Sequence, residues 1–466
     1  MKYKPVKIVA TLGPATHSKE KILELANAGV DVFRINFSHA TPEEAEDRVS
    51  WIRSAESIVK RPLSIMGDLP GPKIRISNMK PDTVLEKGQK FIISKKISIG
   101  DKQGCGLNFP SIVNVLQPGA EVFIDDGTIK LVIDKKIPDA VEATVLVGGL
   151  LKPRKGFSAE GIALSTRGVS EKDKEAIALM VKLKADSLAV SFVQTAQDIW
   201  QVRKLLPPDS KIALIAKIET AYGVDNAEEI LEEADGMMVA RGDLGLAIPI
   251  AKVPLIQKRL ITLCVRNAKP VITATQMLES MITKPIPTRA EVGDVANAIL
   301  DRTDAVMLSA ESAEGKFPIE TVEMMVKIIH ETVPQVSVYE YKERKTTGNA
   351  ITDSAGIIAD QIDAKLIIVF TESGRTARRI SRHRHQVPIL AISPRNVTIH
   401  NLNYSWNVYP QLKQDVTDFD QLLKIAKDIA INNAIVPLEK DDLYIVSAGI
   451  PFRTSGTTNM ILVQKV

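Results

Sequence analysis

The sequence predicts an α/β protein built on an eight-stranded parallel barrel, and three observations lead to this fold class. Eight short runs of β-branched and apolar residues alternate with stretches of helical periodicity. A long strand-rich region interrupts the third of these units, and the pattern restarts in a separate segment after residue 344. The chain of 466 residues is also too long for one ordinary domain. Eight alternating units are typical of a TIM (β/α)8 barrel.

The predicted barrel strands are short and mostly apolar. They cover residues 7–12, 30–36, 63–68, 187–192, 212–218, 237–241, 271–275 and 305–309. Amphipathic helical stretches lie between most of them, for example at residues 19–28, 42–59, 171–184, 250–267 and 319–333. Regular alternation of strand and helix favours parallel strands with the helices outside.

Two further domains are predicted around the barrel. Gly- and Pro-punctuated, strand-like sequence follows Asp68, so we expect a β-barrel-like lid domain over residues 71–165, inserted into a catalytic barrel of residues 1–70 and 166–344. Residues 345–466 form a C-terminal α/β domain with a possible effector site. Its expected strands lie at residues 366–370, 389–392, 443–446 and 460–463.

Composition argues against several classes of protein. The formal net charge of +4 comes from 60 basic and 56 acidic residues, which gives no sign of a nucleic-acid or membrane partner. Cys105 and Cys264 lie far apart in the chain, so we expect neither a disulfide nor a metal cluster. No stretch reaches the ~18 apolar residues of a membrane helix. A cytoplasmic protein is expected.

Polar residues gather where the predicted strands end, which is where active sites of this fold lie. Seven strand ends carry them: Arg34 to His39, Asp68, Ser191, Lys217 with Glu219, Arg241 with Asp243, Thr275, and Ser309 with Glu311. Any one of these would more often be a helix cap or a solvated loop residue. Seven together predict a site.

Lys217, Glu219 and Asp243 indicate the chemistry of that site. Carboxylate oxygens are ligands for Mg²⁺, and an adjacent ammonium can neutralise charge on a transferred phosphoryl group. The set therefore suits a divalent metal held against a phosphorylated carboxylic acid. The alternative is a simple salt bridge between Lys217 and Glu219.

Five motifs together carry a resemblance to a known family. They are KIVATLGPA at 7–15, RINFSH at 34–39, VARGDLG at 239–245, ATQMLESM at 274–281 and PTRAE at 287–291. In this order the chain resembles the pyruvate kinase family over essentially all 466 residues. The resemblance implies Mg²⁺-dependent (or Mn²⁺-dependent) phosphoryl transfer from phosphoenolpyruvate to ADP, giving pyruvate and ATP in glycolysis. It also implies a homotetramer.

The resemblance implies roles for individual residues. The catalytic residues would be Lys217, Thr275 and Arg34. The substrate would contact Arg34, Lys217, Ala240, Gly242, Asp243 and Thr275, and the Mg²⁺ ligands would be Glu219 and Asp243. ADP or ATP would contact Asn36, His39, Arg75 and Lys155. Lys155 lies in the inserted domain, which would act as a lid that excludes water.

The main departure from the family lies in GDLPGPKIR at residues 67–75. Many members read Asp-Thr-Lys-Gly-Pro-Glu-Ile-Arg here and need K⁺, which the resemblance places at Asn36, Ser38, Asp68 and the carbonyl of residue 69. In this chain Lys73 replaces the glutamate and Leu69 replaces the threonine. We expect Lys73 to act as an internal cation, so that K⁺ is not required. The alternatives are a Lys73 side chain in solvent and a retained monovalent site.

The C-terminal domain carries a possible phosphate site. The turn TESGRT at 371–376 opens a predicted helix, where free N–H groups can bind phosphate, although a structural turn is an equal alternative. With residues 454–458 it resembles the family's segments for phosphorylated effectors. The candidate residues are Thr371, Ser373, Gly374, Arg375 and Thr376. The basic run at 375–385 favours a phosphate pocket or a subunit contact over nucleic acid.

Two other functions stay open at this point. A barrel lyase or aldolase acting on pyruvate enolates could use the same metal carboxylates and arginine, but it would not need the inserted lid. A regulatory protein could keep the fold and bind metabolites through the C-terminal domain. The full set of Lys217, Glu219, Asp243 and Thr275 argues against the second alternative, because a protein without catalysis has no chemical need for it.

Overall fold

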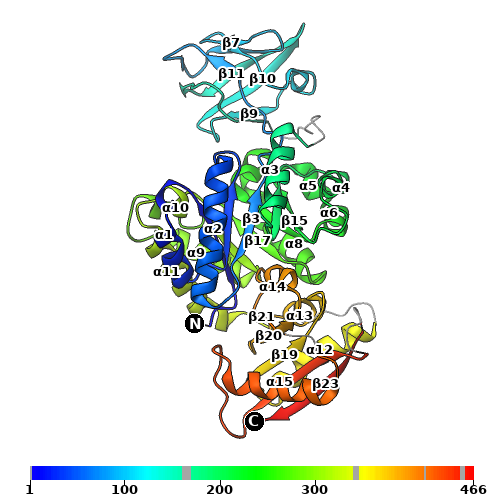
Figure 1. The fold of residues 1–466 in the computed structure, drawn as a ribbon. Coiled ribbons are helices and arrows are strands. Elements are labelled where there is room, and N and C mark those ends of the chain that lie inside the picture. The colour runs from blue at the N-terminus through cyan, green and yellow to red at the C-terminus, as the bar shows by residue number, and fades with distance from the viewer. Residues whose placement is uncertain (1–2, 160–168, 340–345, 414–415, 452–456) are drawn as a thin grey trace.

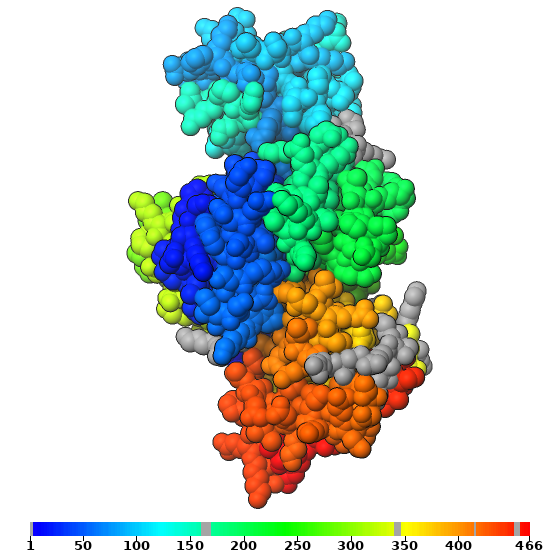
Figure 2. Space-filling view, viewed as in Figure 1, coloured from blue at the N-terminus to red at the C-terminus, as the bar shows by residue number. Residues whose placement is uncertain are grey.

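Three units follow one another along the molecule (Figure 1). The computed structural model describes residues 3–159, 169–339, 346–413, 416–451 and 457–466. The inserted unit lies at one end, the barrel in the middle and the C-terminal unit at the other end (Figure 1). The C-terminal unit abuts the barrel broadly, whereas the inserted unit meets it at a narrower neck (Figure 2). No helix of these described residues is long and apolar enough to cross a membrane.

The central unit is a closed barrel of parallel strands, which confirms the predicted TIM barrel. Its strands are β1 (Lys7–Leu12), β2 (Val32–Asn36), β3 (Ser64–Asp68), β14 (Ser187–Val190), β15 (Ala213–Ile218), β16 (Gly236–Ala240), β17 (Val271–Ala274) and β18 (Ala305–Leu308). They are joined in the order β1-β18-β17-β16-β15-β14-β3-β2, and β2 pairs with β1 to close the ring. Each of the eight predicted strands is present, with ends that differ by a few residues.

Helices surround the barrel and bury their apolar faces against it. They are α1 (Lys19–Ala28), α2 (Pro42–Val59), α3 (Glu171–Lys182), α4 (Ala196–Leu205), α5 (Ala221–Asp225), α6 (Ala227–Glu233), α7 (Arg241–Ala247), α8 (Val253–Arg266), α9 (Arg289–Leu300), α10 (Ala310–Ala313) and α11 (Pro318–Thr332). Helix α2 shows why they begin where they do. Thr41 accepts a hydrogen bond from the Glu44 N–H, Glu44 returns one to Thr41, and Pro42 fills the first turn.

The inserted unit is a β domain with its own apolar core. Its main sheet has the order β13 (Phe157–Ala159), β9 (Glu121–Ile124), β10 (Ile129–Ile137), β11 (Ala140–Val147), β6 (Lys90–Ser94) and β8 (Gly104–Cys105). Two strand pairs complete it: β12 (Gly149–Leu150) with β5 (Val84–Leu85), and β4 (Asn78–Met79) with β7 (Ile99–Gly100). It follows directly on β3, so it stands over the carboxyl ends of the barrel strands (Figure 1).

The C-terminal unit is an α/β domain around one sheet. The sheet order is β21 (Val408–Leu412), β20 (Ile389–Ser393), β19 (Leu366–Phe370), β22 (Leu443–Gly449) and β23 (Thr458–Lys465), with β23 antiparallel. The helices are α12 (Thr347–Gln361), α13 (Arg375–Ser381), α14 (Asn396–Leu402) and α15 (Phe419–Asn432). The predicted domain limits at 165/166 and 344/345 lie outside the described residues, and the limits as a whole stay predictions.

One side chain of the C-terminal unit closes the bottom of the barrel. Tyr404 follows α14 and is 1% exposed, because its ring packs among barrel-interior residues such as Val9, Met66 and Ile215. Its hydroxyl lies 2.6 Å from Ser187 Oγ at the start of β14. The C-terminal domain therefore supplies part of the barrel core.

Candidate active site

A cavity of about 370 Å³ opens at the carboxyl ends of the barrel strands. It brings together most of the residues predicted for the site. Those that line it are Arg34, Asn36, His39, Lys217, Glu219, Ala240, Asp243, Thr275 and Ser309. Because parallel strands in a barrel all end on one face, residues far apart in the chain meet there.

Asp68 links the two cations of the cavity. Its carboxylate accepts a hydrogen bond from Arg34 Nε at 2.6 Å and one from Lys217 Nζ at 3.1 Å. Burial alone would raise its pKa, but the charges of Arg34 and Lys217 outweigh burial and lower the pKa of Asp68. Thr11, at the end of β1, accepts a further hydrogen bond from Arg34 at 2.8 Å. The guanidinium is therefore fixed from two sides.

Lys217 and Glu219 form the salt bridge that the sequence analysis gave as the alternative to a metal site. This salt bridge is one of several contacts that Lys217 makes. Lys217 Nζ lies 3.1 Å from Glu219 Oε1 and donates to Ser191 Oγ at 2.7 Å. Burial opposes the charged ammonium, yet the carboxylates of Asp68 and Glu219 raise the pKa of Lys217. The lysine therefore presents a fixed positive charge to the cavity.

The Glu219 carboxylate is held in place, but its negative charge is only partly neutralised by its neighbours. Its other oxygen accepts from the Phe192 N–H at 2.7 Å. Burial first, and then repulsion from Asp243, raise the pKa of Glu219 to about 7, although Lys217 opposes this shift. Two carboxylates that face one cavity and repel each other are an arrangement that a bound cation would relieve.

The donor set fits Mg²⁺. Glu219 and Asp243 supply hard carboxylate oxygens, and Mg²⁺ commonly uses one or two carboxylates with water and substrate oxygens. Among the described residues no group of three or more His, Cys, Asp and Glu side chains is placed to hold a metal. Because two carboxylates fill only part of the coordination shell of Mg²⁺, a metal here would keep positions free for water and substrate.

Thr275 sits on a strained turn that Arg241 supports. Thr275 has a φ of 67° and Gln276 a φ of 52°, a region that β-branched residues rarely adopt. Arg241 donates to the carbonyl oxygens of Thr275 at 2.6 Å, of Gln276 at 3.1 Å and of Ala274 at 3.3 Å. Thr275 Oγ1 then accepts from the Gly242 N–H at 2.8 Å. Arg241 thus positions the loop and does not itself line the cavity.

Two predicted nucleotide contacts stay within the inserted domain. Arg75 donates to the carbonyl oxygen of Arg154 at 3.0 Å, and Lys155 pairs with Asp125 at 2.9 Å. Neither lines the cavity, unlike Asn36 and His39. The structure therefore brings only half of the predicted nucleotide set to the strand ends.

Lys73 lies beside Asp243, one of the predicted metal ligands. Its ammonium lies 3.5 Å from Asp243 and 3.9 Å from Asp126, and its side chain is 33% exposed. Of the residues proposed for a monovalent ion, Asp68 is engaged by cations and the Leu69 carbonyl accepts from Ser191 Oγ at 2.7 Å. In the same group the Asn36 side chain accepts from the Ser38 N–H at 3.0 Å.

Sequence reasoning missed two contributions, Thr11 and Arg48, and placed one residue, Glu311, at a site that it does not line. Thr11 supplies the polar group of the first strand, the one strand end left out of the prediction, and its position within KIVATLGPA was the available signal. Arg48 on α2 lines the cavity while only 4% exposed, and its Nε has no hydrogen-bond partner among the described residues. No sequence signal distinguishes it from a surface arginine. Glu311 was predicted at a strand end, but it accepts from the N–H groups of Ser309 and Leu278 and does not line the cavity.

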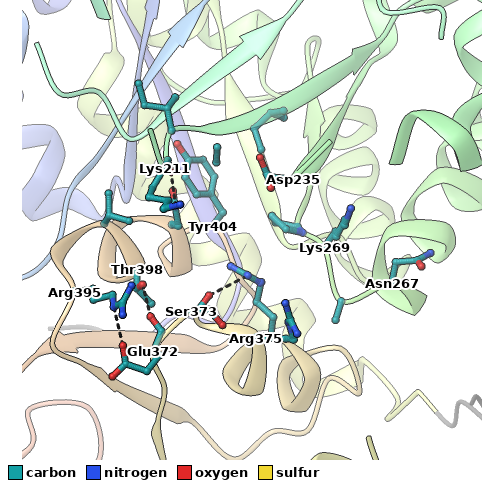
Figure 3. Close-up of a pocket in the computed structure, with 18 of the residues that line it drawn as sticks. Lys211, Asp235, Asn267, Lys269, Glu372, Ser373, Arg375, Arg395, Thr398 and Tyr404 are labelled. Carbon is teal, nitrogen blue, oxygen red and sulfur yellow. Dashed lines mark hydrogen bonds and ion pairs between the residues drawn. The ribbon is translucent and has the colours of Figure 1, made fainter. Parts of the chain in front are cut away.

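The predicted effector turn is divided between two environments. Thr371 Oγ1 accepts from the Gly374 N–H at 3.0 Å, and Thr376 Oγ1 lies 2.6 Å from Thr458 Oγ1. Ser373 and Arg375 instead line a cavity of about 710 Å³ between the barrel and the C-terminal domain (Figure 3). Residues 454–456 of the accompanying segment lie outside the described residues.

A barrel whose strand ends hold two fixed cations against two carboxylates is the framework of a phosphotransferase. The chain belongs to the pyruvate kinase family. The family model for the pyruvate kinase barrel domain matches residues 3–322, and the model for the pyruvate kinase alpha/beta domain matches residues 349–464. These matches confirm the resemblance that the motifs predicted.

Curated relatives agree over nearly the whole chain. A pyruvate kinase of Geobacillus stearothermophilus is 40% identical over 472 residues, which cover 99% of this chain and 80% of the relative. One of Clostridium acetobutylicum is 37% identical over 470 residues, covering 99% of both chains. One of Methylorubrum extorquens is 39% identical over 468 residues, covering 99% of this chain and 97% of the relative.

Proposed function

We propose that this pyruvate kinase transfers the phosphoryl group of phosphoenolpyruvate to ADP in a Mg²⁺-dependent reaction that does not require K⁺. The observation that supports it most is the position of Lys217, buried and held by Asp68, Ser191 and Glu219 at the cavity. A preorganised cation at this point stabilises charge on a phosphoryl group in transfer, which is the main task of a phosphotransferase.

Arg34 and Lys217 bind the phosphoryl group in this proposal. The planar fork of arginine matches phosphate oxygens, and the Asp68 and Thr11 contacts leave its remaining N–H groups free to face the cavity. Glu219 and Asp243 would hold Mg²⁺, which would supply positive charge to neutralise the anionic substrate.

The start of α7, which follows β16, and the turn that follows β17 would contact the rest of the substrate. Gly242 lets the main chain approach the substrate carboxylate closely, together with Ala240 and Asp243. Thr275 Oγ1 lies at the same point and supplies the proton path to the enolate, through water. The strained turn fixes the direction of this hydroxyl.

Nucleotide binding completes the site when the inserted domain closes. Asn36 and His39 already line the cavity, and closure would carry Arg75 and Lys155 toward it. Closure also excludes water that would hydrolyse the phosphoryl donor. Lys73 of the inserted domain lies 3.5 Å from Asp243 of the barrel, so one contact already crosses from the lid to the barrel.

Lys73 would take over the charge of K⁺. Its ammonium is 3.5 Å from Asp243, so the positive charge lies beside the proposed metal ligand and not free in solvent. The family match favours this reaction over the lyase or aldolase and over a regulatory protein. A homotetramer, a cytoplasmic location and a phosphorylated effector at residues 371–376 remain parts of the proposal.

The test is pyruvate formation from phosphoenolpyruvate and ADP with Mg²⁺, in potassium-free buffer and with added K⁺. Comparable rates in both buffers support the whole proposal. Activity only with K⁺ keeps the reaction and rejects the role of Lys73. No activity in either, with Lys217→Met equally inactive, rejects the proposed reaction.

A further inference from the structure

Three arginine and lysine side chains line the candidate active site: Arg34, Arg48 and Lys217. Arg34 and Lys217 share the buried carboxylate of Asp68, at 2.6 Å and 3.1 Å. Arg48 lacks a comparable partner within the described part of the chain. Its Nε has no hydrogen-bond partner there, and its ion pair with Glu44 is long, at 3.5 Å. One cation of the cavity is therefore left largely without a counter-charge.

Glu44 is a weak counter-ion for Arg48 because it also serves the start of α2. The Glu44 oxygen that faces Arg48, Oε2, accepts from the Thr41 N–H at 3.1 Å. The Glu44 side chain is 39% exposed, so water screens its charge, whereas the Arg48 side chain is buried. Burial lowers the pKa of Arg48, and Glu44 opposes this shift only in part. The guanidinium is therefore desolvated and incompletely paired, a state that a bound anion would relieve.

Arg48 lies on the side of the cavity where the predicted nucleotide residues begin. Helix α2 follows β2, so its first turns lie at the face of the barrel that the inserted domain stands over (Figure 1). Asn36 at the end of β2, His39 in the connection and Arg48 on α2 all line the cavity. The proposed metal ligands, Glu219 and Asp243, follow β15 and β16, and β16 lies opposite β2 in the ring of strands. Arg48 therefore belongs to the nucleotide side of the site.

We propose that Arg48 is a further nucleotide-binding residue, which holds the α-phosphate of ADP, the phosphate next to the ribose. This inference rests on the proposed reaction, in which the β-phosphate of ADP accepts the phosphoryl group beside Arg34 and Lys217. The α-phosphate is the next anion along the nucleotide, so an arginine on the β2 and α2 side can meet it. The planar fork of arginine matches two phosphate oxygens at once, and Nε of Arg48 is available for such a contact.

The neighbouring surface suits the nucleoside. The segment after β1 and helix α10 continue this side of the cavity, because β1 pairs with β2 and α10 packs against β1. Their apolar lining residues are Leu12, Pro14, Ala310 and Ala313. Apolar contacts are non-directional, so they cover a base without reading its hydrogen-bonding groups. The contribution of Arg48 should therefore be the same for different nucleoside diphosphates.

The experiment is isothermal titration calorimetry on the full chain with Mg²⁺, using ADP, GDP and phosphoenolpyruvate as probes. Arg48→Gln should bind ADP and GDP at least tenfold more weakly, by the same factor, because a charge-assisted hydrogen bond is lost. Its affinity for phosphoenolpyruvate should be unchanged. Arg48→Lys keeps the charge and loses the fork, so its ADP affinity should lie between those of Arg48→Gln and the original protein. Because Arg48 is buried, circular dichroism checks that both variants fold.

Arg53→Lys is the matched control. Arg53 lies on the same helix, pairs with Glu56 at 2.9 Å and does not line the cavity, so all three affinities should be unchanged. An ADP affinity equal to that of the original protein in Arg48→Gln, or in Arg48→Lys if the glutamine variant does not fold, overturns the inference and leaves the proposed reaction in place.

Two other results also overturn the α-phosphate contact. A loss for ADP that GDP does not share would mean that Arg48 reads the base. An equal loss for phosphoenolpyruvate would mean that Arg48 supports the cavity as a whole. If the original protein binds no ADP, the proposed function fails together with this inference, so the two failures are distinguishable.

Discussion

Arg241 donates a hydrogen bond of 2.6 Å to the carbonyl oxygen of Thr275, whose φ of 67° lies in the left-handed region. The same guanidinium is anchored by Asp294 at 2.6 Å. A β-branched residue keeps such a backbone only where its surroundings enforce it. The direction of the Thr275 hydroxyl therefore depends on an arginine that does not line the cavity.

Replacing Arg241 with lysine should lower kcat about tenfold to a hundredfold, with a smaller effect on KM. A lysine ammonium cannot supply the planar set of donors that holds these carbonyl groups, and small displacements of a catalytic group cost on the order of a hundredfold in rate. Steady-state kinetics measure the effect. Arg302→Lys, at an arginine that donates to Ser337, is the matched control. An unchanged kcat in Arg241→Lys would contradict the positioning role.

Replacing Asp68 with asparagine should lower the free energy of unfolding by about 3 kcal/mol, because removing one partner of a buried ion pair leaves its charge uncompensated. Here two cations, Arg34 and Lys217, lose their shared partner. Urea unfolding measures the loss. Ser191→Ala removes one hydrogen bond to Lys217 without changing charge and should cost about 1 kcal/mol. Equal losses in the two variants would refute the charge argument.

Replacing Glu219 with glutamine should raise the Mg²⁺ concentration for half-maximal activity at least tenfold. The amide keeps the shape but loses the charge that a hard cation binds. Glu44 lines the same cavity and is not among the proposed ligands, so Glu44→Gln should leave the Mg²⁺ titration unchanged. The idea of direct ligation fails if both titrations match that of the original protein.

Replacing Lys73 with glutamate should make the enzyme dependent on K⁺. The substitution removes the ammonium beside Asp243 and restores the residue that K⁺-requiring members carry. We expect low activity in potassium-free buffer and recovery on addition of K⁺. Lys80→Glu, at an exposed lysine of the same domain paired with Asp101, should behave like the original protein in both buffers. Equal activity of Lys73→Glu with and without K⁺ would be evidence against Lys73 as an internal cation.

The pH dependence of stability should carry a contribution from Lys7 at the base of the barrel. Its side chain is buried, its ammonium donates to the Val408 carbonyl oxygen at 2.6 Å, and burial lowers its pKa to about 7 although Asp31 opposes this shift. An unfolded lysine titrates near ~10.4. Between these values the unfolded state binds more protons than the folded state, so the free energy of unfolding rises with pH.

Urea unfolding at several pH values below and above 7 tests this against Lys7→Met. The stability of the original protein relative to the variant should increase by up to about 1.4 kcal/mol per pH unit, the value of one pKa unit. The relative stability should be flat below the folded pKa, where lysine is charged in both states. Parallel pH profiles of the two proteins would show that Lys7 does not titrate in this way.

The barrel could be predicted because its strands are short apolar runs in regular alternation. Helix α9 also lies between two predicted strands, and its start could have been located because Thr288 and Glu291 form a capping box that the sequence shows. Strand β21 was missed because Pro410 argues against a strand, whereas an edge strand tolerates proline. A local signal such as Pro410 can therefore mislead, because the position of a strand in its sheet decides whether proline is tolerated there.

The sequence could predict only those residues of the site whose positions follow from the barrel topology. Lys217 and Glu219 follow from strand ends that must converge in a barrel. The support given by Arg241 and the burial of Arg48 depend on side-chain directions, which no motif records. The separation of Lys155 from the cavity depends on the position of the lid, which the sequence does not determine.

Tyr404 has a consequence for the way this chain is made. Its ring belongs to the interior of a barrel whose first strand begins at Lys7, so the two are almost four hundred residues apart in order of synthesis. On the ribosome, every barrel strand emerges before the tyrosine that seals their base. The apolar base of the nascent barrel therefore stays uncovered until the C-terminal domain has been synthesised, and only then can the barrel core be completed.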